Sequence, residues 1–305
     1  MTTMTFTTTT RPAFSGCYTA LITPFRNGEL DIPALRMLVE RQILGGVAGL
    51  VPCGTTGETP ALTSREWETV VSTVVEATQR RVPVIAGTGS NGTASTIERT
   101  RRAQELGADA ALVVTPYYNK PTQEGLYLHH KAVAEAVDIP QILYNVPGRT
   151  ACDMLPETVL RLAAVPNIVG IKEATGDLAR LDAIRRGCPP DFMLLSGDDA
   201  TACSFILGGG HGVISVTANV APKLMHEMCV SARRGDEAEA RTLDARLQPL
   251  HRDLFVEANP IPVKWAVERM GLIDAGIRLP LTWLSAARQP VVRAALGHAG
   301  ISCRA

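Results

Sequence analysis

The chain has 305 residues, in which 30 Lys and Arg balance 30 Asp and Glu, and 46% of the residues are hydrophobic. A chain of this length and composition can bury one large core, and a single α/β barrel often reaches this size. The balanced charge gives no electrostatic reason to expect a nucleic acid or an acidic membrane surface as a partner. We therefore expect the partner to be a small molecule.

The first ten residues are rich in threonine and lack the basic and apolar segments of a secretory signal. No later apolar run is long enough, and free enough of Gly, Pro and charged residues, to read as a membrane span. We therefore expect residues 1–10 to be a disordered tail. We also expect a cytoplasmic protein without a membrane partner.

Short apolar runs that end in small or polar residues alternate along the chain with helix-like stretches. This alternation is typical of parallel strands joined by crossover helices. The apolar runs cover residues 18–23, 49–53, 83–86, 110–115, 141–145, 168–173, 192–196 and 212–217. Eight such strands are the number that closes a (β/α)8 TIM barrel, which is the fold we predict.

Amphipathic stretches at residues 32–44, 64–79 and 125–136 are predicted to be crossover helices, because each begins after a turn or cap residue. After residue 221 the strand pattern stops, and three further stretches read as helices: 224–232, 237–255 and 262–270. We therefore divide the chain into a catalytic barrel at 11–221 and a C-terminal helical extension at 222–305. No Gly/Ser-rich linker separates the two.

A doubly wound open sheet is the competing fold, because residues 87–92 match the glycine pattern G-x-G-x-x-G of dinucleotide sites. The match is weak, since Asp109, the acidic residue at the right distance, begins the next predicted strand instead of ending it. A turn from strand to helix also needs glycines for backbone reasons alone. The sequence therefore favours the barrel.

The seven cysteines are scattered without a Cys-x-x-Cys pair or a histidine at zinc-ligand spacing. Cys53 lies beside a turn, but buried thiols are usually inert, so a nucleophilic role is disfavoured. His129 and His130 should point to different faces of a helix, and Asp198 and Asp199 to opposite sides of a strand. We therefore expect no metal and no cofactor.

Polar segments follow the predicted strands at the face where a barrel carries its reacting groups. They are residues 54–58, 115–119, 144–150, 172–175 and 196–199. Of the five lysines, only Lys172 directly follows an apolar strand. Desolvation there favours a neutral, nucleophilic amine. A structural ion pair with Glu173 or another acid accounts for the position equally well.

Imine chemistry at this lysine needs a group that moves protons, and Tyr144 can serve if further hydroxyl groups orient it. Thr55, Thr56 and Tyr118 follow other strands and supply such hydroxyl groups. Thr55 and Thr56 also suit the carboxylate of a keto acid, and Arg149 suits a second carboxylate or the incoming aldehyde. The alternative for Tyr144 is a core aromatic residue with a satisfied hydroxyl.

Taken together, these motifs resemble the dihydrodipicolinate synthase family of class I, Schiff-base-forming lyases over nearly the whole chain. The matching stretches are GTTGE at 54–58, TPYYNKP at 115–121, YNVPGRT at 144–150, GIKEATG at 170–176, SGDD at 196–199, GVISVTAN at 212–219 and EANPIPVK at 257–264. Each motif alone is moderate evidence, but their order and coverage make the resemblance strong.

The resemblance implies an imine between Lys172 and pyruvate, and a proton relay formed by Thr55, Tyr118 and Tyr144. It implies that Arg149 guides the aldehyde, with further substrate contacts at Thr56, Gly197 and Ile214. The implied reaction condenses pyruvate with aspartate 4-semialdehyde to 4-hydroxy-tetrahydrodipicolinate, in lysine and diaminopimelate biosynthesis. The implied assembly is a homotetramer of two tight dimers, in which Tyr118 enters the neighbouring active site.

Two other functions remain open. A pyruvate-dependent aldolase or lyase that acts on N-acetylneuraminate or a 2-keto-3-deoxy sugar acid shares the lysine chemistry, although Arg149 after residues 145–148 favours the synthase. A catalytically silent barrel that senses a keto acid is the other alternative. The presence of every relay residue argues against the sensor.

Some relatives with this chemistry are inhibited by lysine at the tight-dimer interface, and the resemblance places five residues at such positions: Asn91, Tyr117, Ser95, Ser64 and Trp67. Asn91 and Tyr117 match the lysine-inhibited pattern. Ser95 replaces a glutamate, Ser64 replaces a histidine found in several bacterial members, and Trp67 occupies a variable position. A serine offers no carboxylate to a cationic effector, so we expect weak or absent inhibition by lysine.

Overall fold

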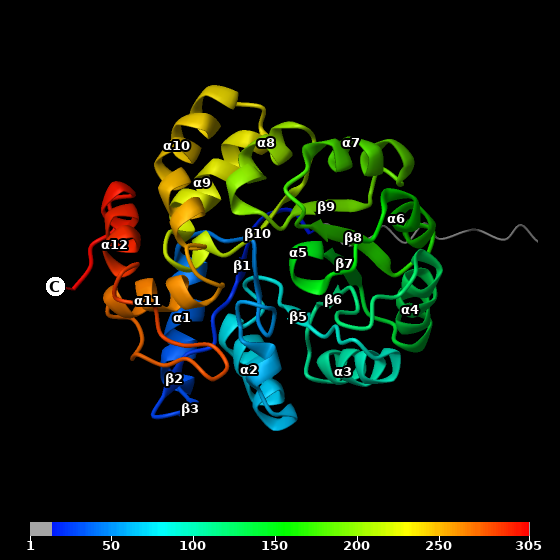
Figure 1. Ribbon diagram of the computed structural model, residues 1–305. Coiled ribbons are helices and arrows are strands. Elements are labelled where there is room, and N and C mark those ends of the chain that lie inside the picture. Colours follow the sequence, from blue (N-terminus) through cyan, green and yellow to red (C-terminus); the bar gives the residue numbers. More distant parts are fainter. Residues whose placement is uncertain (1–13, 305) are drawn as a thin grey trace, which may run out of the picture.

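The computed structural model describes residues 14–304, so the predicted tail at residues 1–10 lies outside the described residues. Eight parallel strands form one sheet in the order β4-β1-β10-β9-β8-β7-β6-β5. A parallel bridge between Leu50 and Val84 joins the two ends of this order, which closes the sheet (Figure 1). The strands are β1 (Gly16–Ala20), β4 (Gly49–Val51), β5 (Ile85–Gly87), β6 (Ala110–Val114), β7 (Gln141–Asn145), β8 (Ile168–Glu173), β9 (Met193–Ser196) and β10 (Gly212–Ser215). The predicted (β/α)8 barrel is confirmed.

Helices connect successive strands and surround the barrel (Figure 1). Three predicted helices are present, as α1 (Ile32–Leu44), α2 (Ser64–Thr78) and α4 (Gln123–Ala136). Helix α2 begins where expected because Thr63 and Glu66 form a reciprocal capping box. The other connecting helices are α3 (Thr93–Glu105), α5 (Pro147–Thr150), α6 (Pro156–Ala163), α7 (Leu178–Gly187) and α8 (Ala202–Leu207).

The barrel strands are buried on both faces, which explains why they appear in the sequence as continuous apolar runs. Inward side chains form one cluster that includes Tyr144 and Val169, whereas Ile168 and Ile171 pack outward against the helices. A register shift between β7 and β8 accounts for this break in strict alternation. Because of the shift, Lys172, which follows the outward-facing Ile171, faces the barrel interior.

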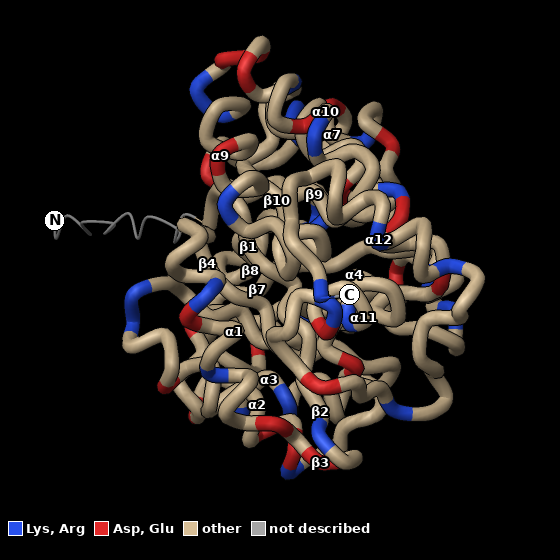
Figure 2. Tube along the Cα trace, turned by 90° about the vertical axis from the view of Figure 1, so that its left-hand side faces the viewer, with Lys and Arg blue, Asp and Glu red and all other residues tan. Residues whose placement is uncertain are grey.

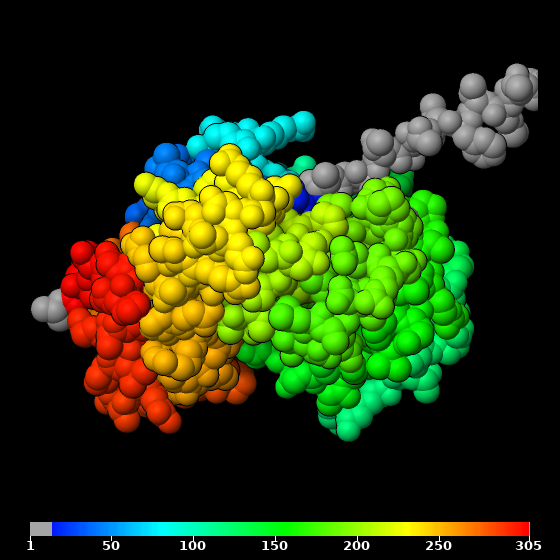
Figure 3. Space-filling model, turned by 90° about the horizontal axis from the view of Figure 1, so that it is seen from above, coloured from blue at the N-terminus to red at the C-terminus, as the bar shows by residue number. Residues whose placement is uncertain are grey.

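The C-terminal segment packs beside the barrel as helices α9 (Pro222–Arg233), α10 (Glu237–Asp253), α11 (Ile261–Arg269) and α12 (Gln289–His298) (Figure 3). The first three were predicted, and α12 was missed. Helix α9 also contacts β1 and β10. The division of the chain at residue 222 stays a prediction.

Two short strands, β2 (Phe25–Arg26) and β3 (Glu29–Leu30), form a hairpin that the sequence analysis missed. Its turn is Asn27-Gly28, with φ of 52° and 84°, and Asn-Gly is a strong hairpin signal. The glycine-rich segment at 87–92 begins with the last residue of β5 and leads to α3. Because the sheet is closed, the doubly wound alternative is wrong. A Cβ atom at Gly87 would lie 2.0 Å from the Cys53 carbonyl oxygen, which gives this glycine a packing reason.

Charges of both signs alternate over the surface, without a large region of one sign in the view of Figure 2. Within residues 14–304, no helix is both long enough and apolar enough to cross a membrane. In the same part of the chain, no three His, Cys, Asp or Glu side chains gather closely enough to hold a metal ion.

Candidate active site

Lys172 lies on β8 inside the barrel, with 6% of its surface exposed. Its register partner on the adjacent strand β7 is Tyr144. The Lys172 Nζ lies 4.3 Å from the centre of the Tyr144 ring, over its face. The predicted site therefore contains a buried amine in direct contact with a tyrosine, both near the carboxyl ends of their strands.

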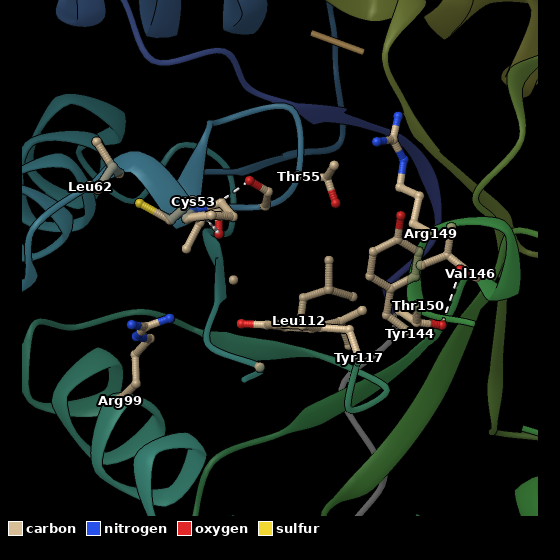
Figure 4. Close-up of a pocket in the computed structure, with 16 residues that line it drawn as sticks. Cys53, Thr55, Leu62, Arg99, Leu112, Tyr117, Tyr144, Val146, Arg149 and Thr150 are labelled. Atoms are coloured by element: carbon tan, nitrogen blue, oxygen red, sulfur yellow. Dashed lines mark hydrogen bonds between the residues drawn. The ribbon is translucent and has the colours of Figure 1, made fainter. Parts of the chain in front are cut away.

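A cavity of about 440 Å³ opens beside this pair and is lined by Thr55, Tyr117, Tyr144 and Arg149 among others. Figure 4 shows the hydroxyl groups of Thr55 and Tyr144 both directed toward the cavity. Lys172 does not itself line this cavity, but its amine contacts the ring of Tyr144, which does. The volume is sufficient for two small carboxylic acids.

The turn after β4 carries Thr55 and Thr56 and is held in place by the C-terminal extension. Thr56 is buried, and its Oγ1 accepts a hydrogen bond of 3.0 Å from Asn259 Nδ2. Glu58, at the end of the turn, forms a buried ion pair with Lys264 at 2.5 Å. Burial lowers the pKa of Lys264 to about 8, and the attraction of Glu58 opposes part of this decrease.

Sequence reasoning missed both Asn259 and Lys264 as supports of the site. Each lies about 200 residues from its partner in the chain. Their only sequence signal was the family-like stretch at 257–264. Arg149, on the short helix α5, also reaches this segment, because its Nη2 donates to the Asn259 carbonyl oxygen at 3.5 Å.

Two predicted substrate contacts lie in the barrel interior. Ile214 is buried within the same inner cluster as Tyr144. Gly197 lies against Lys172, since a Cβ atom added to Gly197 would be 2.9 Å from the lysine Cε. The structure therefore brings Gly197 and Ile214 to the part of the barrel that holds the lysine.

Tyr118 is placed differently from the other predicted relay residues. Its surface is 89% exposed, and its backbone has a positive φ of 75°, which is strained for an aromatic residue. It does not line the cavity beside Tyr144. Of the three predicted relay residues, Thr55 and Tyr144 line the cavity of their own chain, and Tyr118 does not.

The five predicted regulatory residues are divided between two cavities and a loop. Ser64, Trp67 and Ser95 line a second cavity of about 390 Å³ between α2 and α3. Tyr117 lines the first cavity, and the Asn91 carbonyl oxygen accepts a hydrogen bond from Asn119. One further residue, Arg99, lines both cavities and was missed by the sequence analysis.

The surroundings of the other residues considered in the sequence analysis favour structural roles over catalytic ones. Cys53 is buried, and burial raises the pKa of its thiol far above the ordinary range, which disfavours a thiolate. Asp198 and Asp199 do not lie on a strand as expected, because β9 ends at Ser196 and Asp199 begins the 3-10 helix η2 (Asp199–Thr201). The Asp199 carboxylate accepts hydrogen bonds from the N–H groups of Val216 and Thr217.

A (β/α)8 barrel with a buried lysine beside a tyrosine, next to a cavity lined by further hydroxyl groups, is the arrangement of a class I lyase. The family model described as the dihydrodipicolinate synthetase family matches residues 13–299. The chain belongs to this family.

Similar proteins include synthases that match this chain over nearly their whole length. The 4-hydroxy-tetrahydrodipicolinate synthase of Methylococcus capsulatus is 62% identical over 287 residues, which cover 94% of this chain and 99% of that protein. The crystal structure of the chloride-inhibited dihydrodipicolinate synthase of Acinetobacter baumannii, in complex with pyruvate, is 52% identical. It superposes with a TM-score of 0.93 and covers 94% of this chain and 99% of that one. A monomeric dihydrodipicolinate synthase variant is 45% identical, with a TM-score of 0.93 over 95% of this chain and 98% of that one.

Proposed function

We propose that the chain is a 4-hydroxy-tetrahydrodipicolinate synthase that condenses pyruvate, held as an imine of Lys172, with aspartate 4-semialdehyde. The observation that carries the proposal is the contact between the buried Lys172 amine and the Tyr144 ring inside the barrel. The relatives named above support the choice of reaction within the Schiff-base lyases. This reaction belongs to lysine and diaminopimelate biosynthesis.

The chemistry requires an amine and a group that transfers protons. The Lys172 amine adds to the ketone carbon of pyruvate, and loss of the ketone oxygen as water gives the imine. Loss of a methyl proton then gives an enamine, whose carbon attacks the aldehyde carbon. The amino group of the second substrate finally displaces Lys172 and closes the ring. We assign these proton transfers to Tyr144, because its ring contacts the lysine and its hydroxyl faces the cavity (Figure 4).

The remaining roles concern the two carboxylates. We assign the hydroxyl groups of Thr55 and Thr56 to the carboxylate of pyruvate, and Arg149 to the second substrate. Thr55 and Arg149 line the cavity, and Thr56 is the buried neighbour of Thr55 in the same turn. Gly197 and Ile214 shape the space around the imine. Tyr118 is assigned to the relay of a neighbouring subunit, in a homotetramer built from tight dimers.

Lys264 is the competing nucleophile, because burial lowers its pKa to about 8. Its side chain is completely buried, however, and its amine is paired with Glu58. A carbonyl substrate would have to break this ion pair in the protein interior, which costs several kcal/mol. Lys172 is therefore the residue that we assign as nucleophile.

Borohydride reduction in the presence of pyruvate tests the assignment. Peptide mass analysis should find the reduced adduct on Lys172, and Lys172→Ala should abolish both the adduct and turnover. Lys223→Ala, at a residue whose side chain is 79% exposed, is the control and should retain both. An adduct on Lys264, or none, would refute the assignment.

A panel of aldehydes tests the choice of reaction. The synthase should consume pyruvate with aspartate 4-semialdehyde, whereas a sugar-acid aldolase would cleave N-acetylneuraminate or a 2-keto-3-deoxy acid. A sensor would bind the keto acid and consume nothing. The cytoplasmic location and the tetramer are parts of the proposal that need separate measurements, by cell fractionation and analytical ultracentrifugation.

A further inference from the structure

Asn259 connects the C-terminal extension to a predicted carboxylate-binding residue of the barrel. It lies between α10 and α11 and is 5% exposed. Its side-chain Nδ2 donates to Thr56 Oγ1 at 3.0 Å, across 203 residues of sequence. Its backbone oxygen accepts from Arg149 Nη2 at 3.5 Å. One buried residue thus contacts both groups that we assign to substrate carboxylates, through two different parts of its structure.

We propose that the Asn259 side chain is a positioning residue for pyruvate: it orients the Thr56 hydroxyl so that the hydroxyl proton is donated to the pyruvate carboxylate. This inference rests on the proposed function, because it concerns how the keto acid is bound. Asn259 does not touch the reacting atoms itself. Its effect passes through Thr56.

The direction of the hydrogen bond carries the argument. An amide NH₂ group can only donate, whereas a threonine hydroxyl has one proton to donate and lone pairs that accept. When Asn259 Nδ2 donates to Thr56 Oγ1, the hydroxyl proton is left for another acceptor. Thr56 is only 2% exposed, so bulk water does not reorient its hydroxyl freely. An incoming carboxylate then meets a hydroxyl that already offers its proton.

Neighbouring contacts make this orientation rigid. The turn that carries Thr56 ends at Glu58, which is fixed by the buried ion pair with Lys264 and by a hydrogen bond of 3.0 Å from the Arg278 backbone N–H. Both partners belong to the same C-terminal extension as Asn259. The extension therefore holds the backbone of the turn through Glu58 and the hydroxyl of Thr56 through Asn259.

The two contacts of Asn259 predict that a mutation of its side chain affects the KM values of the two substrates differently. Replacing the side chain removes the hydrogen bond to Thr56, but the backbone oxygen that contacts Arg149 remains. Asn259→Ala should therefore raise the KM for pyruvate about tenfold and change the KM for the aldehyde much less, because a hydrogen bond to a charged group is lost. A general disturbance of the site would raise both KM values.

The test is a double-mutant cycle with steady-state kinetics on the full-length protein. Asn259→Ala should raise the KM for pyruvate in the parent but cause no further increase in Thr56→Val, since the hydroxyl is then absent. Gln248→Ala is the matched control, because this amide on α10 donates to the Ala200 carbonyl oxygen away from the cavity. It should leave both KM values unchanged.

Asn259→Asp provides a second variant of the same shape in case Asn259→Ala does not fold. Its carboxylate accepts the Thr56 proton and repels the keto acid, so the KM for pyruvate should rise more than in Asn259→Ala. An unchanged KM for pyruvate in both variants would overturn the inference, and so would an equal increase in the Thr56→Val background. If the parent protein neither traps pyruvate nor consumes it, the proposed function itself is refuted and the inference with it.

Discussion

The backbone of Gly197 lies directly against the side chain of Lys172. A Cβ atom at position 197 would be 2.9 Å from the lysine Cε and 3.0 Å from its Cγ, and 2.6 Å from the Ala174 Cβ. The strand cannot easily move away, because the Gly197 N–H donates to the Glu173 carbonyl oxygen at 2.7 Å. Only a glycine at this position leaves the proposed nucleophile in its observed place.

Gly197→Ala should therefore lower kcat by roughly tenfold to a hundredfold, because a displacement of about 1 Å at a reacting group has effects of this size. The rate of borohydride trapping with pyruvate should decrease together with kcat. Gly297→Ala, on α12, is the control, since a Cβ atom there meets no atom within 4 Å. Full activity in Gly197→Ala would mean that the lysine can shift without a cost to catalysis.

Much of the barrel was visible in the sequence because both faces of its strands are buried, which produces apolar runs that end in polar residues. Helix α1 has the predicted bounds for a local reason, since the Asp31 side chain caps it by accepting from the Ala34 N–H. Lys172 was found because it follows such a run directly. The β8 register shift that turns it inward leaves no pattern that periodicity alone detects.

The supports of the site were missed because they depend on contacts between distant segments. The ion pair between Glu58 and Lys264 and the hydrogen bond between Thr56 and Asn259 join residues more than 200 positions apart. Sequence spacing carries no information about such pairs until the fold is known. The missed hairpin at Asn27-Gly28 is different, because its turn signal was present in the sequence and was overlooked.

Tyr118 should act across a subunit interface. Its side chain is almost fully exposed and outside the cavity of its own chain, so it needs a neighbouring subunit to reach an active site. Inactive Tyr118→Phe and Lys172→Ala chains, refolded together, should regain activity, because a hybrid dimer contains one site with both residues intact. Activity and sedimentation of the mixture measure this. Refolding each variant alone provides the control.

The complementation also has a clear negative outcome. If each site uses its own Tyr118, every site in the hybrid lacks either the hydroxyl or the amine, and mixing restores nothing. One of the similar structures, 45% identical, is described as a monomeric variant of dihydrodipicolinate synthase. Sedimentation of the parent as an active monomer would likewise contradict the prediction.

Stability should decrease in acid because of two buried histidines on α4. Burial lowers the pKa of His129 to about 4, and burial together with His129 lowers the pKa of His130 well below its ordinary value. Between about pH 6.5 and 4 the unfolded chain thus binds more protons than the folded chain. The free energy of unfolding therefore falls as the pH falls through this range, by about 1.4 kcal/mol per pH unit for each proton.

Denaturant unfolding at several pH values measures this slope. His130→Leu should reduce the slope, because it removes one of the two groups that take up these protons on unfolding. Leucine is a suitable replacement, since neither ring nitrogen of His130 has a hydrogen-bond partner to lose. His298→Gln, at an exposed residue, is the control and should leave the slope as it is in the parent. A slope that His130→Leu does not change would show that other groups cause the acid sensitivity.

Inhibition by lysine should be weak or absent. In the cavity between α2 and α3, Ser95 donates its hydroxyl to the Gly92 carbonyl oxygen at 3.0 Å and offers no carboxylate to an ammonium group. Arg99 adds a positive charge to the same cavity, with its guanidinium carbon 5.9 Å from the centre of the Trp67 ring. The cavity is lined by three glutamates and three arginines, and Glu68 and Glu105 are both paired with Arg102, so the serine at position 95 and the charge of Arg99 both disfavour a cationic effector.

The loss of a hydrogen bond to a charged group is worth about 1.5–3 kcal/mol, which corresponds to roughly tenfold or more in affinity. Ser95→Glu should therefore strengthen whatever inhibition exists, whereas Ser95→Gln, which has a similar length without the charge, should not. The measurement is activity against lysine at fixed pyruvate. Strong inhibition of the parent at submillimolar lysine would contradict the prediction. In that case Glu98, which lines the same cavity, would be the first carboxylate to test as the partner of the lysine ammonium group. If it has this role, Glu98→Gln should weaken the inhibition.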